Sequence, residues 1–567
     1  MSKIINIKRT LIVGLLAGVC VSFTTGCKQF TKYDEGITYK KVEFTNLSDE
    51  FVCDTTSMRL YFQNNGNVPY VSVNAFLSNL DGVIDTSVFR YKFNYFSNCM
   101  ELHRYYSEDS YASIKFDWKN NVISGSNYCC SGVLKSTWQT NYSSFIKNVD
   151  HYYYGSSQCT YNLDSYYFDI LVLEDKCLIP LVIANILFCS QNHYNVFYNG
   201  DKLYGYYGEI SSYDAEYEMI RNSSLNGKDI PNDVKKATVN SFLFAMDYFY
   251  GLKEQKDIDK FKNYIYDKNL SNLWSTDPTI THQAFCDIIY NQLDELHSRV
   301  NIPSMYASRD INVDINRGSR TSRYYDRYYT QRELRQNAFP NGVPPVRYYG
   351  DTAIITFNSF VTAPSSSIYE YDGSIKSDAW KQDSYFFMRH CMEEISYHSE
   401  IKDVVIDLSL NGGGNIGAMI RVLGFLTDKI INYSTHDMLT GEYYISKYKI
   451  DTDGDGFYDN DAYDQYNWNV LVGENTFSAA NAFTSNVLEQ NLATVIGQRS
   501  GGGMCSVMSI VLADGTGISI SSNNSIRYVV EEDDKLMFYG IESGLKPNKT
   551  LDYEYFYNDS AIAELIG

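Results

Sequence analysis

Near the carboxyl end of the chain, the hydrophobic positions predict a buried strand, a tight turn and a helix. The strand is the unbroken apolar run at residues 470–472, and residues 473–475 end it. From Ser478 onward, apolar residues recur at helical spacing. A serine at such a turn exposes its hydroxyl beside the first N–H groups of the helix, which suits a nucleophile whose attack creates an oxyanion. An ordinary N-cap serine gives the same pattern.

Two glycine-rich turns flank this serine along the chain. Residues 404–417 read VVIDLSLNGGGNIG, which predicts a strand, three glycines and a helix. Consecutive glycines let backbone N–H groups approach a ligand without interference from Cβ atoms. A phosphate-binding loop would need GK[ST] or GxGxxG, and neither follows. Residues 494–503, TVIGQRSGGG, predict another strand that runs into glycines.

These three stretches, taken in order, resemble peptidase family S41, which contains the C-terminal processing and tricorn-core proteases. The family pattern runs roughly D-L-R-x-N-x-G-G, a serine before a helix, and V-G-x-x-T-x-G, and the resemblance covers about residues 232–566. It implies an α/β core of the ClpP and crotonase type, a polypeptide substrate and no cofactor required for catalysis. It also implies Ser478 as nucleophile, with an oxyanion hole made by the Ala479 amide and an amide of Gly412 or Gly413.

The resemblance separates two possible general bases. In the C-terminal processing branch the base is a lysine at the end of the third motif. The matching position here is Gly503, and no lysine occurs between residues 478 and 530, so a lysine base is excluded. In the tricorn-like branch the base is a histidine. Residues 293–299, LDELHSR, resemble the segment L-x-D-G-H-T/S of that branch and predict His297 as the base; a surface histidine near a helix end is the alternative.

The same branch uses a glutamate near its carboxyl end, in a segment like E-G-x-G-V-x-P-D. Residues 541–548, IESGLKPN, resemble it and place Glu542 in that role, where it would orient the site or hold the end of the substrate. An exposed glutamate at a strand end is the alternative. Tricorn-like sites also have a serine just before the histidine, but here Leu296 is there and Ser298 follows. The sequence therefore leaves open what orients His297.

The first 27 residues predict an export signal. Three cationic residues precede an apolar stretch at 11–23 that is too short to span a bilayer comfortably, and Gly26 and Cys27 follow. This resembles a lipoprotein signal, with Cys27 lipidated after cleavage, although Thr24 replaces the usual leucine. An uncleaved membrane anchor is the alternative. Either way, the protein is expected to be exported, and the lipid at Cys27 would hold it on the cell envelope.

The net charge and the cysteines limit which partners the protein is expected to bind and whether disulfides are expected. The formal net charge is −20, and removal of the signal, which carries three cations and no acidic residue, makes it −23. Nucleic acid is therefore not an expected partner. Ten cysteines remain beyond Cys27, and they show neither a C-x-x-C pair nor a metal-like cluster with histidine. Six of them lie between Cys53 and Cys177, so a disulfide or two is expected in that region of an exported protein.

Residues 28–231 predict a strand-rich α+β module with a weak internal repeat. Residues 67–80 and 176–188 each combine an apolar strand, a proline and a short amphipathic helix. After the second copy, Asn199-Gly200 predicts a hairpin turn. The 52 tyrosines of the chain favour strands and surfaces that face sugars or peptides, without choosing between them. We interpret this module as a spacer or recognition domain without catalytic residues.

The rest of the chain divides into three parts. Residues 232–300 predict helices, one of which begins at the Ser-Thr-Asp-Pro sequence 275–278. Residues 301–345 are polar and rich in Arg and Tyr, which predicts a loop or linker, too short for the PDZ domain that many S41 peptidases insert there. Residues 346–567 then predict the core, with strands at 352–360 and 404–408 and helices at 384–398 and 416–426.

An acidic segment inserted before the serine strand, DTDGDGFYDND at 451–461, predicts a calcium loop. Asp451, Asp453 and Asp455 occupy positions 1, 3 and 5 of such a loop, a glycine occupies position 6, and Asp459 occupies position 9. Position 12 is Ala462, so the bidentate glutamate is missing. The alternative is a solvated hairpin tip. We expect any calcium here to stabilise structure and not to take part in catalysis.

Two functions therefore remain after the sequence is considered alone. The first is a lipid-anchored serine endopeptidase with Ser478, His297 and Glu542 in its site. The second is a non-catalytic surface lipoprotein that binds peptide, glycan or lipid on the same fold, because a fold does not determine function. The presence of all three residues together favours the enzyme.

Overall fold

The computed structural model describes residues 36–126, 134–135, 140, 143–156, 158–268, 270–459, 461–532 and 535–567. The expected signal with Cys27, and the adjacent Cys129 and Cys130, lie outside the described residues. Within this part of the chain, no helix has the length and apolar content that crossing a bilayer requires.

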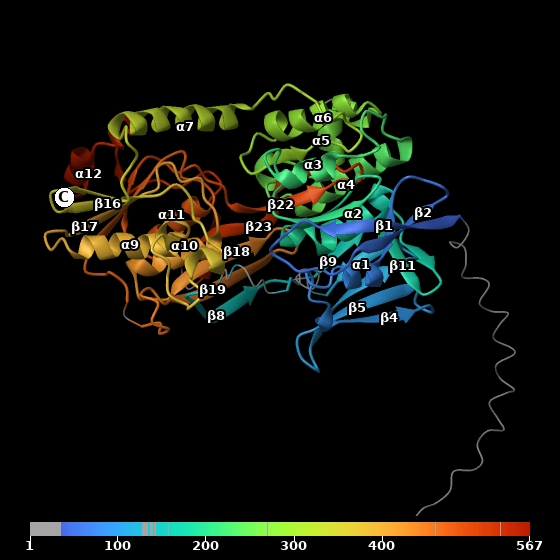
Figure 1. Cartoon of the computed structure of the whole chain (residues 1–567), viewed down its shortest axis with the longest axis horizontal. Coiled ribbons are helices and arrows are strands. Elements are labelled where there is room, and N and C mark those ends of the chain that lie inside the picture. The colour runs from blue at the N-terminus through green and yellow to red at the C-terminus, as the bar shows by residue number, and fades with distance from the viewer. Residues whose placement is uncertain are drawn as a thin grey trace, which may run out of the picture.

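A six-stranded sheet forms the core that positions the serine turn (Figure 1, left). Five of its strands run parallel to their neighbours, and the first, β15, pairs antiparallel with β16. The strand order is β15 (Val346–Tyr349), β16 (Thr352–Thr356), β17 (Asp403–Asp407), β20 (Asn467–Val472), β21 (Thr494–Gly497) and β25 (Lys549–Thr550). The strands predicted around residues 352 and 404 and the apolar run before Ser478 are thus confirmed.

Both faces of the sheet are buried at its central strands β16, β17, β20 and β21, which explains why these strands are mostly apolar. Val404 and Val470 point into a cluster shared with helices α9 (Ser384–Ser396), α10 (Ile416–Leu423) and α11 (Ala479–Glu489). Val405 and Leu471 point the other way, into a cluster that contains Ile562 of α12 (Asp559–Ile566). Because consecutive strand residues alternate between faces, one run of sequence fills two cores. The prediction of an α/β core is confirmed.

A second, antiparallel sheet connects this core to the earlier parts of the chain (Figure 1, centre). The long strand β23 is its centre and pairs with β14, β18, β22 and β24, while β19 joins β18 to the edge strand β8. These strands are β8 (Ile146–Tyr154), β14 (Arg299–Ile302), β18 (Ile431–Asp437), β19 (Glu442–Ile450), β22 (Cys505–Val511), β23 (Gly517–Glu532) and β24 (Lys535–Gly540). Strand β14 follows His297 directly, so this sheet fixes where the histidine segment meets the core.

The amino-terminal part contains two further sheets, as its strand-rich pattern predicted (Figure 1, right). The seven-stranded sheet has the order β10 (Leu171–Leu173), β11 (Lys176–Pro180), β3 (Tyr70–Ser72), β2 (Ser57–Gln63), β1 (Ile37–Asn46), β13 (Leu203–Tyr207) and β12 (Tyr194–Tyr198). The five-stranded sheet has the order β4 (Phe89–Asn94), β5 (Cys99–Tyr105), β6 (Tyr111–Asp117), β7 (Val122–Gly125) and β9 (Cys159–Asn162).

The predicted repeat corresponds to two strand–helix units. Strand β3 leads into α1 (Val73–Asn79) and strand β11 leads into α2 (Leu181–Phe188), and the two strands pair antiparallel with each other. The hairpin predicted at Asn199-Gly200 joins β12 to β13, and Gly200 has the positive φ of +92° that such a turn requires.

Helices link this part to the core, and one of them was not predicted. They are α3 (Ala215–Arg221), α4 (Asn232–Phe249), α5 (Phe261–Asp267), α6 (Pro278–Cys286), the π-helical η8 (Asp287–Gln292) and α7 (Ser319–Ala338). The start of α6 is as expected, because Asp277 accepts hydrogen bonds from the amides of Thr279 and Ile280. By contrast, the expected loop or linker at 301–345 contains the 20-residue helix α7.

Helix α7 was not predicted because the residues that stabilise it lie far from it in the sequence. Its first backbone N–H groups, those of Arg320 and Thr321, donate to the carboxylate of Asp294 at 2.8 and 2.9 Å, so the cap comes from another segment. Its apolar contacts are few: Tyr328 and Leu334 pack on the cluster under the main sheet. Neither feature produces a local signal of the kind that marks most helices.

The expected disulfides are absent among the described cysteines. Cys53, Cys99, Cys159 and Cys177, four of the six in the region considered, are free thiols. Burial raises the pKa of the Cys53, Cys159 and Cys177 thiols, so these side chains act as small apolar core groups.

Candidate active site

Ser478 lies at the turn between β20 and α11 with a strained backbone. Its φ of 56° and ψ of −122° fall outside the regions that L-residues normally occupy. The side chain makes no capping hydrogen bond to the helix and is half-buried, with its hydroxyl free to react. The N-cap alternative therefore does not describe this serine. Backbone strain of this kind is concentrated at functional sites.

Both flanking segments hold the turn, as their order in the sequence suggested. The Ser478 amide donates to the carbonyl of Gly502 at 2.9 Å, and the Phe477 amide donates to the carbonyl of Asn411 at 3.1 Å. One residue earlier, the Thr476 hydroxyl donates to the carbonyl of Leu408 at 2.7 Å. Three segments that are far apart in the chain thus converge on one peptide.

The glycines after β17 come close enough to form an oxyanion hole with the helix. A Cβ atom at Gly413, which has φ +108°, would lie 2.7 Å from Ser478 Cβ and 2.9 Å from the Ala479 nitrogen, so only glycine fits. The Gly413 amide already donates to Asn411 Oδ1 at 2.9 Å. The amides of Gly412 and Ala479 have no partner among the described residues and are the two available donors.

His297 lies in the segment between η8 and β14, and its ring packs on Phe477, the neighbour of Ser478. The two ring centroids are 4.7 Å apart, and the histidine is only 6 % exposed. Its Nε2 atom is buried and has no hydrogen-bond partner in the described part of the chain. His297 therefore lies next to the serine turn, but the hydrogen bond expected between the two side chains is not formed here.

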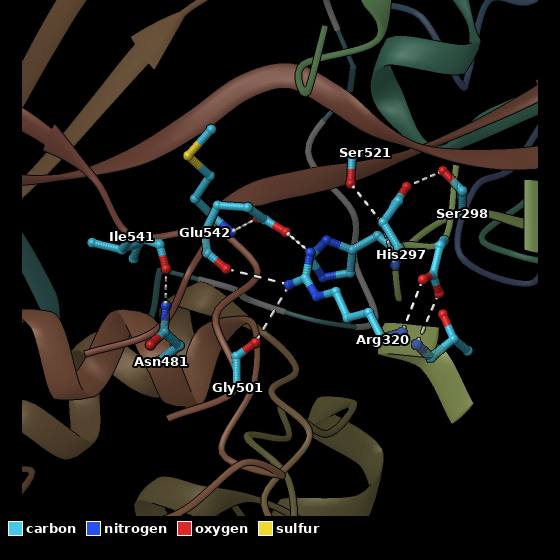
Figure 2. Close-up of polar contacts among 12 residues, drawn as sticks. His297, Ser298, Arg320, Asn481, Gly501, Ser521, Ile541 and Glu542 are labelled. Atoms are coloured by element: carbon cyan, nitrogen blue, oxygen red, sulfur yellow. Dashed lines mark hydrogen bonds and ion pairs between the residues drawn. The ribbon is translucent and has the colours of Figure 1, made fainter. Parts of the chain in front are cut away.

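The residue that holds the histidine segment is Glu295, which the sequence analysis did not identify. Its buried carboxylate accepts the His297 backbone N–H at 2.8 Å, the Ser521 hydroxyl at 3.1 Å and the Ser298 hydroxyl. In Figure 2, a dashed line joins each of Ser298 and Ser521 to this carboxylate. The sequence left open what orients His297 when Leu296 replaces the usual serine. Here the carboxylate of Glu295 holds the backbone of His297, and no serine at position 296 is needed to support the ring.

Burial sets the protonation state of His297. Desolvation lowers the pKa of His297 from 6.5 to about 4, because the charged imidazolium loses its contact with water, and the negative charge of Glu542 partly opposes this shift. At neutral pH the imidazole is therefore uncharged and can accept a proton. The influence of Glu542 also means that this carboxylate lies near enough to stabilise an imidazolium once it forms.

Glu542 is buried and held by Arg320 at the amino end of α7. One guanidinium nitrogen donates to Glu542 Oε1 at 2.8 Å, and the other donates to the Glu542 carbonyl at 3.2 Å and the Gly501 carbonyl at 3.5 Å (Figure 2). Glu542 Oε2 accepts the Met504 amide at 2.9 Å. The strand-end alternative, an exposed glutamate, is therefore wrong, and Arg320 is a site residue that the sequence did not suggest.

A cavity of about 460 Å³ opens beside this ion pair. Its walls come from α7, from the turn after β21 and from the segment around Glu542; they include Leu296, Arg320, Tyr324, Glu474, Gly501 and Glu542. Ser478 and His297 are not among its lining residues, so this cavity lies on the Glu542 side of the site and not over the serine hydroxyl.

The acidic loop brings four carboxylates together, but not the four that were expected. Single oxygens of Asp451, Asp453, Asp455 and Asp461 all lie within 4.8 Å of one another, so Asp461 takes the place foreseen for Asp459. One Asp461 oxygen is buried without a hydrogen-bond partner in the described part of the chain. Burial, and after it the negative charge of the neighbouring aspartates, raises the pKa of Asp461 to about 7. This donor set of carboxylate oxygens suits Ca²⁺.

Comparison with known proteins gives a family match over the core of the chain. Residues 353–542 match the model of peptidase family S41, and no curated protein matches the chain. A solved structure assigned as a peptidase from Parabacteroides merdae is 16 % identical and has a TM-score of 0.38, with 59 % of this chain and 97 % of that chain covered.

Two further solved structures are similar over shorter shares of their own length. The photosystem II D1 C-terminal processing protease is 16 % identical with a TM-score of 0.28, covering 40 % of this chain and 53 % of that one. The tricorn protease is 11 % identical with a TM-score of 0.28, covering 84 % of this chain and 47 % of that one. This chain thus spans about half the length of each of these two proteins.

Gly503, at the position of the lysine base in one branch, has no room for a side chain. Its φ is +82°, and a Cβ atom there would lie 2.5 Å from a ring carbon of Phe477. The same Phe477 ring packs on His297. An added side chain at 503 would therefore displace Phe477 and, through it, the histidine.

We expect Gly503→Ala to be more destabilising than Gly441→Ala. Both glycines have φ near +80°, so both alanines carry a left-handed penalty of about 1–2 kcal/mol. Nothing lies within 4 Å of a Cβ at Gly441, whereas the alanine at 503 also meets Phe477. Urea unfolding measures the difference, and the His297 ring resonances should shift only in Gly503→Ala. Equal unfolding free energies in the two variants would contradict this packing.

Proposed function

Residues 353–542 belong to peptidase family S41, and from this we propose that the chain is a serine endopeptidase with Ser478 as nucleophile and His297 as general base. The observation that carries the proposal is the turn at Ser478. Its backbone is strained, its hydroxyl makes no cap, and Gly413 packs directly on it. The amides of Ala479, which follows it, and of Gly412, which precedes Gly413, have no partner among the described residues. An ordinary structural serine needs none of these features.

In the proposed mechanism, the Ser478 hydroxyl attacks the carbonyl carbon of the scissile peptide bond. His297 accepts the hydroxyl proton and later gives it to the leaving amine. The negative charge that develops on the carbonyl oxygen is stabilised by the N–H groups of Ala479 and Gly412, and each such donor typically lowers the barrier by about 3 kcal/mol. Water then releases the acyl group from Ser478 by the same steps in reverse.

Glu542 and Arg320 support this cycle by their charge and position. The Glu542 carboxylate favours the imidazolium form of His297, which exists only while the proton is in transit. Arg320 holds Glu542 through the 2.8 Å ion pair and keeps α7 against the site. Because His297 Nε2 lacks a partner, substrate binding must bring it within hydrogen-bond distance of the Ser478 hydroxyl.

A second candidate function is binding without hydrolysis, of peptide, glycan or lipid. The observation that favours it is the missing Ser478–His297 hydrogen bond, together with the burial of His297 beneath Phe477. Lipidation at Cys27 and a place on the cell envelope would suit either function; both stay predictions from the sequence. The two functions differ in whether Ser478 becomes covalently modified.

We expect a fluorophosphonate probe to label the purified chain on Ser478, because this reagent needs an activated serine beside an oxyanion hole. Ser478→Ala should abolish labelling and peptide hydrolysis with the circular dichroism spectrum unchanged. The matched control is Ser485→Ala, another serine of the same helix, which should be labelled normally. Labelling that persists in Ser478→Ala would disprove the nucleophile, and absence of labelling in the natural chain would favour binding without hydrolysis.

We expect kcat/KM to rise with a midpoint near pH 4 and to stay level through neutrality. The base must be unprotonated, and burial lowers the pKa of His297 from 6.5 to about 4. Glu542→Gln should move this limb to lower pH, because Glu542 raises that pKa.

The stability of the fold must be controlled for in this measurement. The pKa of His297 is about 4 in the folded chain and 6.5 in the unfolded chain, so the unfolded chain takes up the proton first as the pH falls. The free energy of unfolding is therefore highest above pH 6.5 and decreases as the pH falls toward 4. Activity is therefore compared only where circular dichroism shows a folded chain. A rising limb near pH 6.5 would mean that the active form does not have His297 buried as described.

We also propose that the acidic loop binds Ca²⁺ as a structural ion, held by Asp451, Asp453, Asp455 and Asp461. Added Ca²⁺ should raise the thermal midpoint, since a ligand at a hundred times its Kd stabilises by roughly 2.7 kcal/mol. Asp453→Asn with Asp461→Asn should remove the shift, while Asp310→Asn, an exposed acid elsewhere, should keep it. No shift in the natural chain, or the same shift in the double variant, would contradict the site.

A further inference from the structure

A second cavity, of about 670 Å³, lies in the amino-terminal part and shares no lining residue with the cavity beside Glu542. Four segments enclose it. They are the turn between β2 and β3, the start of α4, residues 167–169 after the short 3₁₀ helix η4 (Asp164–Tyr166), and Trp274 at the end of the 3₁₀ helix η7 (Ser271–Trp274). The volume is in the range of small-molecule sites, and the lining is mainly apolar with several polar groups.

Two aromatic rings at this cavity are turned toward water. Tyr167 is 77 % exposed and Trp274 is 42 % exposed, although the cavity beside them would accept either ring. Large aromatic side chains left at the mouth of an apolar cavity retain their main binding surface for a ligand.

The backbone at Tyr167 is held in a conformation that a tyrosine rarely adopts. Its φ of 56° and ψ of 37° place it in the left-handed region, where glycine is the usual residue. A tyrosine here costs stability and contributes no packing through its exposed ring. The same left-handed conformation occurs at His193 and Asp257, which also end 3₁₀ helices, so here it acts as a helix cap and fixes the position of the exposed ring at the cavity.

Helix α4 supplies the polar wall. Asp233, Lys236, Ala237 and Asn240 all line the cavity, and their spacing of three and four residues puts them on one face of the helix. Asn240 is only 7 % exposed as a residue, yet its amide is not one of the buried side-chain groups that lack a partner in the described part of the chain. As part of the cavity wall, this amide offers a donor NH₂ group and an acceptor oxygen to a ligand.

We propose that this cavity binds a neutral saccharide, whose C–H faces stack on Tyr167 and Trp274 and whose hydroxyl groups bond to Asn240 and its neighbours. The polar lining offers side-chain amides, which donate and accept hydrogen bonds, and carboxylates, which accept them, so that both kinds of bond that vicinal hydroxyls need are available. The charged lining groups are Asp169, Asp233 and one lysine, Lys236, so the net charge is negative and disfavours phosphates and other anions.

The surroundings favour a saccharide over an extended peptide. Peptides commonly bind by adding a strand to an exposed sheet edge. The strands that border the cavity, β2 and β3, each have neighbours on both sides within the seven-stranded sheet, so no edge is available. The inference does not depend on the proposed peptidase activity, because it uses none of the residues around Ser478.

Binding is tested on the full chain carrying Ser478→Ala, by calorimetric titration with maltotriose, cellotriose, xylotriose and chitotriose. At least one should bind, and Trp274→Ala should weaken it by about tenfold or more. Tyr167→Gly should weaken it similarly without lowering the thermal midpoint, since glycine suits the left-handed backbone at this position. Asn240→Leu should also weaken it, while circular dichroism shows a folded chain. Tyr213→Ala, at a tyrosine 97 % exposed elsewhere, is the matched control and should bind normally.

Three outcomes would overturn the proposal. None of the four saccharides binds; a saccharide binds equally well to the natural residues and to the Trp274, Tyr167 and Asn240 variants; or a peptide substrate of the natural chain binds and is lost in those same variants. Failure of fluorophosphonate labelling at Ser478 has no bearing on this titration, so the two proposals stand or fall separately.

Discussion

The strained peptide at Ser478 is the constraint on which the rest of the site depends. A left-handed serine costs about 1–3 kcal/mol and persists only where its surroundings leave no alternative. Here the constraint comes from hydrogen bonds to Asn411 and Gly502, on the segments that follow β17 and β21, the two parallel strands that flank β20. Because parallel strands present their carboxyl ends at one edge, the sheet brings these carbonyls to the same place. The main sheet thus serves chiefly to hold one turn in an unfavourable shape.

The antiparallel sheet performs the corresponding task for the histidine. Its long strand β23 pairs with β14 just after His297 and supplies Ser521 to the carboxylate of Glu295. One sheet therefore positions the serine and another positions the histidine. The contact between the rings of Phe477 and His297 joins the serine turn to the histidine segment. Buried polar groups that are satisfied in this way specify one arrangement of the segments that contribute them.

The sequence was most informative where a signal is local. The apolar run before Ser478, the glycines near 413 and the Asp277 cap each involve neighbouring residues, and all appear where expected. It failed where a partner is distant. The carboxylate of Asp294 caps helix α7, and the carboxylate of Glu295 accepts a hydrogen bond from a serine 226 residues away. In the acidic loop, the conformation of the backbone brings Asp461 to the other three carboxylates. Such pairings are set by tertiary structure and leave no periodic trace.

The ring of Phe477 has a consequence for how this site could have arisen. It fills the space that a lysine at 503 would need and, at the same time, forms the surface on which His297 rests. A lysine could be introduced only together with a smaller residue at 477, and that change would remove the support of the histidine. Intermediates with either change alone would have neither base in place. The packing of one ring thus makes a side chain at 503 and the present position of His297 mutually exclusive.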